Sequence, residues 1–214
     1  MTVSLEFTQA LQSHQIELPE AQQLQIARYC ELLWGWNRRL NLTRHTDYSS
    51  FVGRDVIDSV RLTALLAAGE RVLDIGSGGG VPGIMVALLR SDVQVTLSET
   101  IGKKAAVLVE LVKELELPCA VVQGRAELAL DSASFNSVVA RGVGPMSKIL
   151  RWVQPYWSAF DRLLLIKGPR WVEERGEARH RGLLHDLSLR KIASYPIPGT
   201  GAESVVLQIT RDKT

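Results

Sequence analysis

Apolar residues recur at helical spacing through the first third of the chain. The spacing predicts two helices within residues 4–34, separated at Leu18-Pro19 because a proline pushes the preceding residue out of the helical region. A further helix is predicted over residues 54–68. The apolar positions behind these predictions are Leu5, Phe7, Leu11, Leu24, Ile26, Ala27, Cys30, Leu33 and Trp34, followed by Val56, Ile57, Val60, Leu62, Leu65 and Leu66.

From Arg71 onward the pattern changes to apolar runs that alternate with helical segments. Strands are predicted over residues 71–75, 94–99, 119–123, 136–141, 161–167, 191–196 and 204–210. Helices are predicted near residues 82–90, 102–116, 145–158 and 171–186. Strands that alternate with helices indicate parallel βαβ units in an open, doubly wound α/β sheet.

The end of the chain departs from this alternation. The last two predicted strands are joined through Gly199-Thr200-Gly201 with no helix between them, which indicates an antiparallel hairpin at the sheet edge. We therefore expect a seven-stranded, mostly parallel sheet with an antiparallel terminal strand. Residues 1–69 are expected to form a helical extension that packs on a catalytic domain over residues 70–214.

Composition and charge narrow the class of protein further. The longest apolar runs, such as residues 81–89, fall well short of the roughly 18 residues that span a bilayer, so no membrane segment is expected. The N-terminus lacks a basic stretch followed by an apolar core, so we expect no secretory signal and a cytoplasmic protein. Cys30 and Cys119 are predicted to be buried free thiols. The net charge of +2 gives no reason to expect a dimer, and a monomer is predicted.

The most informative stretch is Arg71-Val72-Leu73-Asp74-Ile75-Gly76-Ser77-Gly78-Gly79-Gly80-Val81-Pro82-Gly83. It predicts a buried strand, a tight glycine turn and the start of a helix. Glycine tolerates positive φ and has no side chain, so such a turn lets backbone N–H groups approach a ligand at the end of the strand. Residues 78–83 match the pattern G-x-G-x-x-G, so a dinucleotide is one candidate ligand.

Three features favour a different ligand. Asp74 lies in the strand two residues before the first glycine, Glu99 ends the second strand, and Ala126-Glu127 follows the third. Together with the terminal hairpin, these residues resemble the Rossmann-like class I S-adenosylmethionine-dependent methyltransferases. The resemblance implies that the glycine loop passes the methionine moiety, Glu99 binds the ribose hydroxyls and residues 126–127 meet adenine. A carboxylate also suits two vicinal hydroxyls on chemical grounds alone.

Further motifs narrow the resemblance. They are Trp36-Asn37-x-x-Leu40-Asn41-Leu42-Thr43, Arg54-x-x-x-Asp58-Ser59, residues 74–83, Gly102-Lys103-Lys104, Arg125-Ala126-Glu127, Ala140-Arg141-Gly142 and Ile166-Lys167-Gly168. Their combination resembles the RsmG family, also called glucose-inhibited division protein B, of bacterial small-subunit rRNA guanine-N7 methyltransferases. Two departures are visible: the family usually has histidine where Asp55 stands, and residues 141–146 are more glycine-rich than usual.

The resemblance implies an enzyme that transfers a methyl group from S-adenosylmethionine to N7 of a specific guanine in 16S rRNA. Its substrate is then 16S rRNA or the small ribosomal subunit. The residues that it places around the cofactor are Gly76, Gly78, Val81, Glu99, Ala126, Glu127 and Arg141. Candidates for the pocket of the target base are Asn41, Asp58 and Ser59.

This reaction requires few chemically reactive groups from the protein. Guanine N7 has an unprotonated lone pair, so no general base is needed, and the leaving thioether is neutral. Catalysis is expected to rest on alignment and exclusion of water, with no nucleophilic side chain and no metal. Basic residues and an aromatic tract are candidates for RNA contacts, although core packing is favoured for Trp34 and Trp36.

Other functions stay open from the sequence alone. A methyltransferase that acts on a small molecule or protein would share the cofactor half of the site. An NAD-binding oxidoreductase would use the same glycine turn. A ribosome-assembly factor that has lost activity is a further alternative, which the departures at Asp55 and Gly142 allow.

Overall fold

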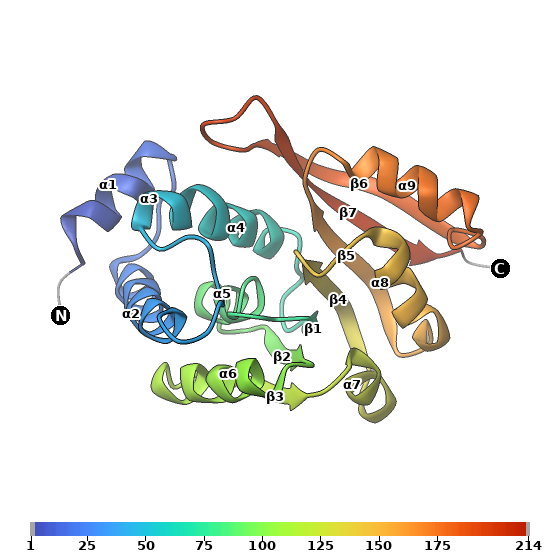
Figure 1. Cartoon of the computed structure of the whole chain (residues 1–214), viewed down its shortest axis with the longest axis horizontal. Helices are drawn as coiled ribbons and strands as arrows, with labels where there is room; N and C mark the ends of the chain where they lie inside the picture. The colour runs from blue at the N-terminus through green and yellow to red at the C-terminus, as the bar shows by residue number, and fades with distance from the viewer. Residues whose placement is uncertain (1–2, 213–214) are drawn as a thin grey trace.

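The computed structural model describes residues 3–212, and a seven-stranded sheet runs through its centre (Figure 1). The strand order is β3-β2-β1-β4-β5-β7-β6. The first five strands pair in parallel, whereas β7 pairs antiparallel with both β5 and β6. The strands are β1 (Arg71–Ile75), β2 (Gln94–Glu99), β3 (Ala120–Gln123), β4 (Phe135–Arg141), β5 (Phe160–Lys167), β6 (Leu187–Pro196) and β7 (Glu203–Arg211). The predicted sheet, including its antiparallel strand and terminal hairpin, is confirmed.

Helices flank this sheet on both sides. The N-terminal ones are α1 (Leu5–Ser13), α2 (Glu20–Asn37), α3 (Tyr48–Phe51), the π-helical turn η1 (Val52–Val56) and α4 (Ile57–Thr63). The others are α5 (Gly83–Leu89), α6 (Gly102–Glu114), α7 (Ala126–Ser132), α8 (Met146–Val153), the 3₁₀ turn η2 (Gln154–Tyr156) and α9 (Trp171–His180). None of the helices in the described part of the chain combines the length and apolar character needed to cross a membrane.

Two hydrophobic clusters cover the two faces of the sheet. Successive strand residues alternate between them: Val72 belongs to the first cluster and Leu73 to the second, as the period of two in a strand requires. The first cluster holds residues of α1, α2, α4, α5 and α6, and the second holds residues of α7, α8 and α9. The N-terminal helices therefore share a core with the sheet and are not a loosely attached appendage.

The chain direction positions the site. From β1 the chain moves outward through β2 to β3 and then returns to β4, which pairs with β1 on its other side. In open α/β sheets, ligands bind outside the carboxyl ends of the strands where the strand order reverses in this way. Here that point lies between the ends of β1 and β4, at the centre of Figure 1.

Several predicted boundaries were wrong. The helix expected over residues 54–68 begins at Tyr48, because Asp47 caps it through its side chain, and it ends at Thr63. The helix α7 was not predicted, although its buried residues Ala126, Ala129 and Leu130 have helical spacing.

The C-terminal boundaries also differ. The helix expected to reach residue 186 ends at His180, and β6 begins at Leu187 rather than at residue 191. Gly182 and Asp186 take positive φ and turn the chain between them. The ladder between β6 and β7 contains a bulge between Lys191 and Ala193. Four extra residues of β6 therefore pair with β7.

The predicted core packing of Trp34 and Trp36 is confirmed, because both pack against the first hydrophobic cluster. The Trp34 indole packs edge-on against Tyr48 and Phe51, and its Nε1 donates a 2.8 Å hydrogen bond to the carbonyl oxygen of His45. Both cysteines are free thiols, but only Cys30 is fully buried, whereas Cys119 is half-buried.

Candidate functional site

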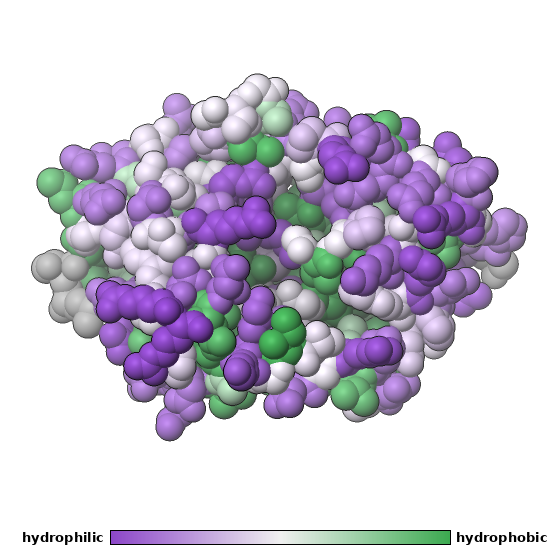
Figure 2. Space-filling model, viewed as in Figure 1, coloured by the Kyte–Doolittle hydropathy of each residue, from purple (hydrophilic) through white to green (hydrophobic). Residues whose placement is uncertain are grey.

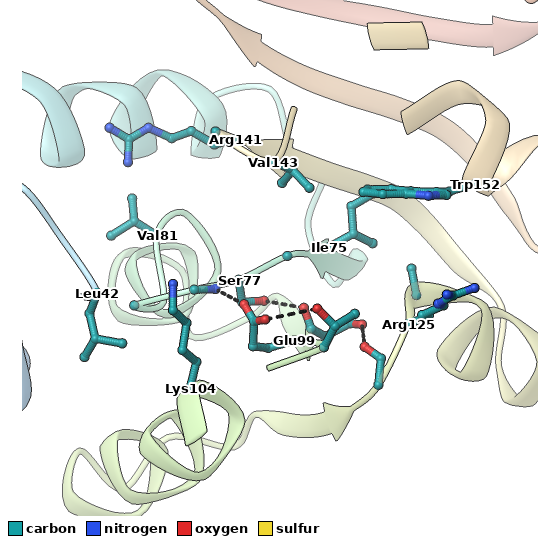
Figure 3. A pocket seen from close by; sticks show the side chains of 18 of the residues that line it. Leu42, Ile75, Ser77, Val81, Glu99, Lys104, Arg125, Arg141, Val143 and Trp152 are labelled. Atoms are coloured by element: carbon teal, nitrogen blue, oxygen red, sulfur yellow. Dashed lines mark hydrogen bonds between the residues drawn. The ribbon is translucent and has the colours of Figure 1, made fainter. Parts of the chain in front are cut away.

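A cavity of about 770 Å³ opens at the carboxyl ends of β1, β2 and β4. Figure 2 shows hydrophilic residues over most of this face of the molecule, with apolar residues at the bottom of a central hollow. Every residue predicted to surround a cofactor lines this cavity: Gly76, Gly78, Val81, Glu99, Ala126, Glu127 and Arg141. Segments that are up to 65 residues apart in sequence thus meet at one site, and Figure 3 shows the side chains of Val81, Glu99 and Arg141 around it.

The glycine loop fits tightly between its neighbours. Gly76 has a φ of +69°, and a Cβ there would lie 2.9 Å from a methyl group of Val143. At Gly79 a Cβ would lie 3.0 Å from Leu33 and 3.2 Å from the carbonyl oxygen of Leu42. Glycine at these positions therefore lets the loop pack closely against its neighbours, and the approach of its backbone N–H groups to a ligand stays a prediction.

Asp74 supports the loop from below. Its Oδ2 accepts a 3.1 Å hydrogen bond from the Gly83 N–H, and a Cβ on Gly83 would lie 2.7 Å from that same oxygen. Asp74 does not line the cavity and instead braces the loop through this hydrogen bond. Its Oδ1 has no hydrogen-bond partner among the described residues. Burial raises the pKa of this carboxyl group to about 7.

Glu99 lies at the bottom of the cavity, and its carboxylate is held by the backbone on both sides. Oε2 accepts a 2.9 Å hydrogen bond from the Gly78 N–H, and Oε1 accepts one of 2.8 Å from the Ile101 N–H. Oε1 also accepts a longer, 3.4 Å hydrogen bond from the Thr100 hydroxyl, whereas Oε2 retains an open acceptor position. Glu99 is therefore oriented in advance to receive hydroxyl donors from the cavity.

Arg141, at the end of β4, is held by two carboxylates. Its Nη1 lies 2.6 Å from Oδ1 of Asp55, and its Nε lies 2.6 Å from Oδ2 of Asp58. Asp55 lines the cavity, and its Oδ2 lies 2.8 Å from Nδ1 of His45. Burial alone would lower the pKa of Arg141, but Asp55 and Asp58 reverse this and raise it. The guanidinium is thus fixed and charged.

The three candidates for a base pocket lie outside the lining of this cavity. Asp58 is buried, and its Oδ1 accepts a 2.8 Å hydrogen bond from the hydroxyl of Tyr195. Ser59 is also buried and donates to the carbonyl oxygen of Asp55. Asn41 is exposed, beside the lining residue Leu42. Asp58 and Ser59 therefore have internal partners, and Asp58 contributes to the site through Arg141.

The opposite end of the cavity contains a residue, Trp152, that the sequence did not reveal. Trp152 of α8 lines it, and the Lys148 Nζ lies 4.9 Å from the centre of its ring. In Figure 3 the indole lies across the cavity from Arg125, which caps the start of α7. The spacing of Lys148 and Trp152, four residues apart on one helix, placed them on one face but did not indicate that this face meets a ligand.

The N-terminal extension also forms part of the wall. Leu33, Leu42 and Thr43 line the cavity beside the glycine loop. Asn37 fixes the connecting loop, because its Oδ1 accepts hydrogen bonds from the N–H groups of both Leu42 and Thr43. The motif around Asn37 was noted in the sequence, but its contact with the glycine loop depends on tertiary packing.

Within residues 3–212, no group of three or more histidine, cysteine, aspartate or glutamate side chains is arranged to hold a metal ion. The carboxylates at the site instead pair with arginine, histidine and backbone N–H groups.

Curated proteins with similar sequences share one description. The protein described as ribosomal RNA small subunit methyltransferase G from Rhodopirellula baltica is 50% identical over 201 residues, which cover 94% of this chain and 87% of the relative. The protein of the same description from Chromobacterium violaceum is 32% identical and covers 92% of this chain and 93% of the relative.

Solved structures support the fold. A crystal structure of an MtNAS variant has a TM-score of 0.59 at 13% identity and covers 98% of this chain and 78% of its own. A dimethyladenosine transferase from Plasmodium falciparum has a TM-score of 0.52 at 14% identity, covering 74% and 62%. The family model described as rRNA small subunit methyltransferase G (GidB) matches residues 22–196. The chain therefore belongs to the rRNA small subunit methyltransferase G family.

Proposed function

We propose that this protein transfers a methyl group from S-adenosylmethionine to N7 of a specific guanine in 16S ribosomal RNA. The choice of cofactor is supported above all by the carboxylate of Glu99, which the Gly78 and Ile101 N–H groups orient at the bottom of the cavity. Family membership supports the choice of substrate.

The residues of the cavity fit this cofactor. Its volume of about 770 Å³ lies within the range of ordinary small-molecule sites. Gly76, Gly78 and Val81 would border the methionine moiety, with Arg141 facing its carboxylate, and Glu99 would accept from the ribose hydroxyls. Ala126 and Glu127, at the start of α7, would contact the adenine.

The protein acts by binding and orientation. When bound, S-adenosylmethionine supplies an electrophilic methyl group on a positively charged sulfur. The glycine loop and Val143 limit the space at one side of the cavity, and Glu99 fixes the ribose end. Because guanine N7 already carries a free lone pair, no side chain has to remove a proton. Alignment of the reacting groups can account for several kcal/mol of the barrier.

Basic side chains around the cavity would contact the RNA. Lys104, Arg125 and Lys148 line the cavity, and Arg38 and Arg39 are exposed at the end of α2. Contacts of such side chains with phosphates position an RNA without reading its sequence. These residues therefore favour a polyanionic substrate over a small neutral one.

Two measurements test the function. Calorimetry should show binding of S-adenosylhomocysteine and none of NAD, and the reverse result would overturn the proposal in favour of an oxidoreductase. Mass spectrometry of 16S rRNA from a strain that lacks the gene should show one guanine without its N7 methyl group. Labelled methyl transfer into protein or small molecules, with none into small subunits, would instead indicate a different acceptor.

We also propose that the enzyme acts in the cytoplasm as a monomer with the division expected from sequence, residues 1–69 and 70–214. The exposed large hydrophobic residues are scattered over five elements or loops, with no shared patch indicated by their positions: Leu5, Ile101, Val109, Leu128 and Val172. Light scattering coupled to gel filtration should give a mass near 23.7 kDa, whereas twice that mass would indicate a dimer.

A further inference from the structure

Asp55 occupies a position that the methyl-transfer reaction described above does not use. It lies in the π-helical turn η1, is 2% exposed and lines the cavity on the side of Arg141. A carboxylate removed from water in this way needs partners that compensate for its lost hydration. π-Helical turns of this kind often occur at functional sites.

The contacts of Asp55 leave room for another cation. Its Oδ1 pairs with the Arg141 Nη1 and its Oδ2 with the His45 Nδ1, one partner for each oxygen. A carboxylate oxygen can accept two hydrogen bonds, so each retains one acceptor position. Asp55 can therefore receive a further donor from the cavity without losing its partners.

Arg141 has a complementary free position. Its Nε and Nη1 are engaged by Asp58 and Asp55, whereas its Nη2 has no hydrogen-bond partner among the described residues. Two carboxylates face this one guanidinium, and Arg54, which does not line the cavity, lies 4.0 Å from Asp58. Of the two carboxylates that pair with Arg141, only that of Asp55 borders the cavity.

A carboxylate and a guanidinium that lie side by side match the two charged groups of an α-amino acid. We infer that Asp55 binds the α-ammonium group of the cofactor's methionine moiety, while Arg141 faces the adjacent carboxylate. This inference rests on the proposed function and names a specificity residue for it. His45 acts as a positioning residue, because it holds the second oxygen of Asp55. The cavity then selects a zwitterionic ligand.

Three ligands distinguish the contribution of the ammonium group to binding from that of the carboxylate group. S-Adenosylhomocysteine carries both the ammonium and the carboxylate group, its desamino analogue carries only the carboxylate, and 5′-methylthioadenosine carries neither. In calorimetry, Asp55→Asn should weaken binding of S-adenosylhomocysteine by about 10- to 100-fold, the range expected for a charged hydrogen bond. Binding of 5′-methylthioadenosine should change by less than about threefold, and the desamino analogue, which Asp55→Asn affects only through Arg141, should weaken clearly less than S-adenosylhomocysteine.

Asp58→Asn provides the matched control. Asp58 pairs with the same guanidinium but does not line the cavity. Its replacement should act through Arg141 and so weaken S-adenosylhomocysteine and the desamino analogue alike. Equal weakening of both ligands by Asp55→Asn would overturn the inference, because Asp55 would then act only by orienting Arg141.

Measurements on the unaltered protein remain informative if Asp55→Asn does not fold. The unaltered protein should prefer S-adenosylhomocysteine over the desamino analogue by about tenfold or more, and equal affinities would overturn the inference. If the unaltered protein bound neither S-adenosylhomocysteine nor its desamino analogue, the proposed function itself would be overturned. The two failures are therefore distinguishable.

Discussion

The hydroxyl of Tyr29, in the N-terminal helix α2, donates a 2.8 Å hydrogen bond to the carbonyl oxygen of Gly79 in the glycine loop. Both groups are buried, and burial raises the pKa of the tyrosine hydroxyl well above its usual value, so it stays protonated as a donor. The extension thus holds the loop directly.

Replacement of this tyrosine tests that connection. Tyr29→Phe leaves the Gly79 carbonyl without its partner in an apolar environment, so the free energy of unfolding should fall by about 1–3 kcal/mol. Affinity for S-adenosylhomocysteine should fall with it. Urea unfolding and calorimetry check both effects. Tyr156→Phe, where the hydroxyl makes no hydrogen bond to the described residues, is the control and should change neither value.

Glu99 is expected to carry much of the cofactor affinity. Glu99→Gln keeps the shape but removes the charge, and its amide NH₂ group faces one of two backbone N–H donors, Gly78 or Ile101. We expect S-adenosylhomocysteine to bind about 10- to 100-fold more weakly. Glu110→Gln on the exposed face of α6 should bind normally. Unchanged affinity of the Glu99 variant would remove the ribose assignment.

Trp152 is expected to stack on a base within the cavity. Its indole lies across the cavity from Arg125 (Figure 3), which directly precedes the proposed adenine contacts Ala126 and Glu127 in the lining. Trp152→Ala should therefore weaken binding of 5′-methylthioadenosine by about 1–3 kcal/mol, as measured by calorimetry. Trp152→Phe retains an aromatic face and should restore most of this loss. Equal affinities for all three proteins would show that the ring does not meet the adenine.

The loop between β4 and α8 is held from α9. The buried Lys167 Nζ donates a 2.6 Å hydrogen bond to the Gly144 carbonyl oxygen and lies 2.7 Å from Oε2 of Glu174. That same oxygen accepts from the Met146 N–H. This loop carries Val143, which packs on Gly76.

Replacement of the buried Lys167 should lower the free energy of unfolding. Lys167→Met leaves the Glu174 carboxylate without its cation and the Gly144 carbonyl without its donor, so we expect the free energy of unfolding to fall by about 3–5 kcal/mol in urea titrations. Glu173→Gln breaks the neighbouring exposed pair with Arg170 and should cost less than about 1 kcal/mol. Similar losses for both variants would contradict a structural role specific to Lys167.

Asp74 should make stability depend on pH. Its pKa is raised to about 7 by burial, so the folded state retains a proton that the unfolded state releases above pH ~4. The contribution of Asp74 to stability is therefore fully present below that pH and decreases as pH rises through about 7, by up to about 4 kcal/mol. Asp74→Asn should remove this decrease. Urea unfolding of both proteins at pH 4.5, 6 and 7.5 would reveal it, and parallel curves would contradict it.

The sheet was predictable because local pattern determines it. The strands Arg71–Ile75 and Gln94–Glu99 were predicted to the residue, since buried parallel strands are short apolar runs bounded by turn residues. The helix α7 was missed because it is only seven residues long, so its apolar positions are too few to show a clear helical period.

The lining residues at the ends of β1, β2 and β4 could also be predicted from the sequence, because glycine loops and acidic strand ends occur at fixed places in this fold. The part of the cavity wall that the N-terminal extension forms could not be predicted. Asp55, Leu42 and Thr43 reach the cavity only through packing of the extension on the first hydrophobic cluster. Likewise, Asp58 was expected in a base pocket, but its distant partners Arg141 and Tyr195 could not be inferred from spacing.

The bulge between Lys191 and Ala193 has a consequence for the behaviour of the protein in a crowded solution. Strand β6 is one border of the sheet, where unpaired backbone groups can recruit a strand from another molecule. The bulge and the exposed Arg190 and Lys191 beside it disfavour such pairing. The other border, β3, is only four residues long. Both borders thus resist aggregation, so a protein that binds long RNA can remain dispersed at high concentration.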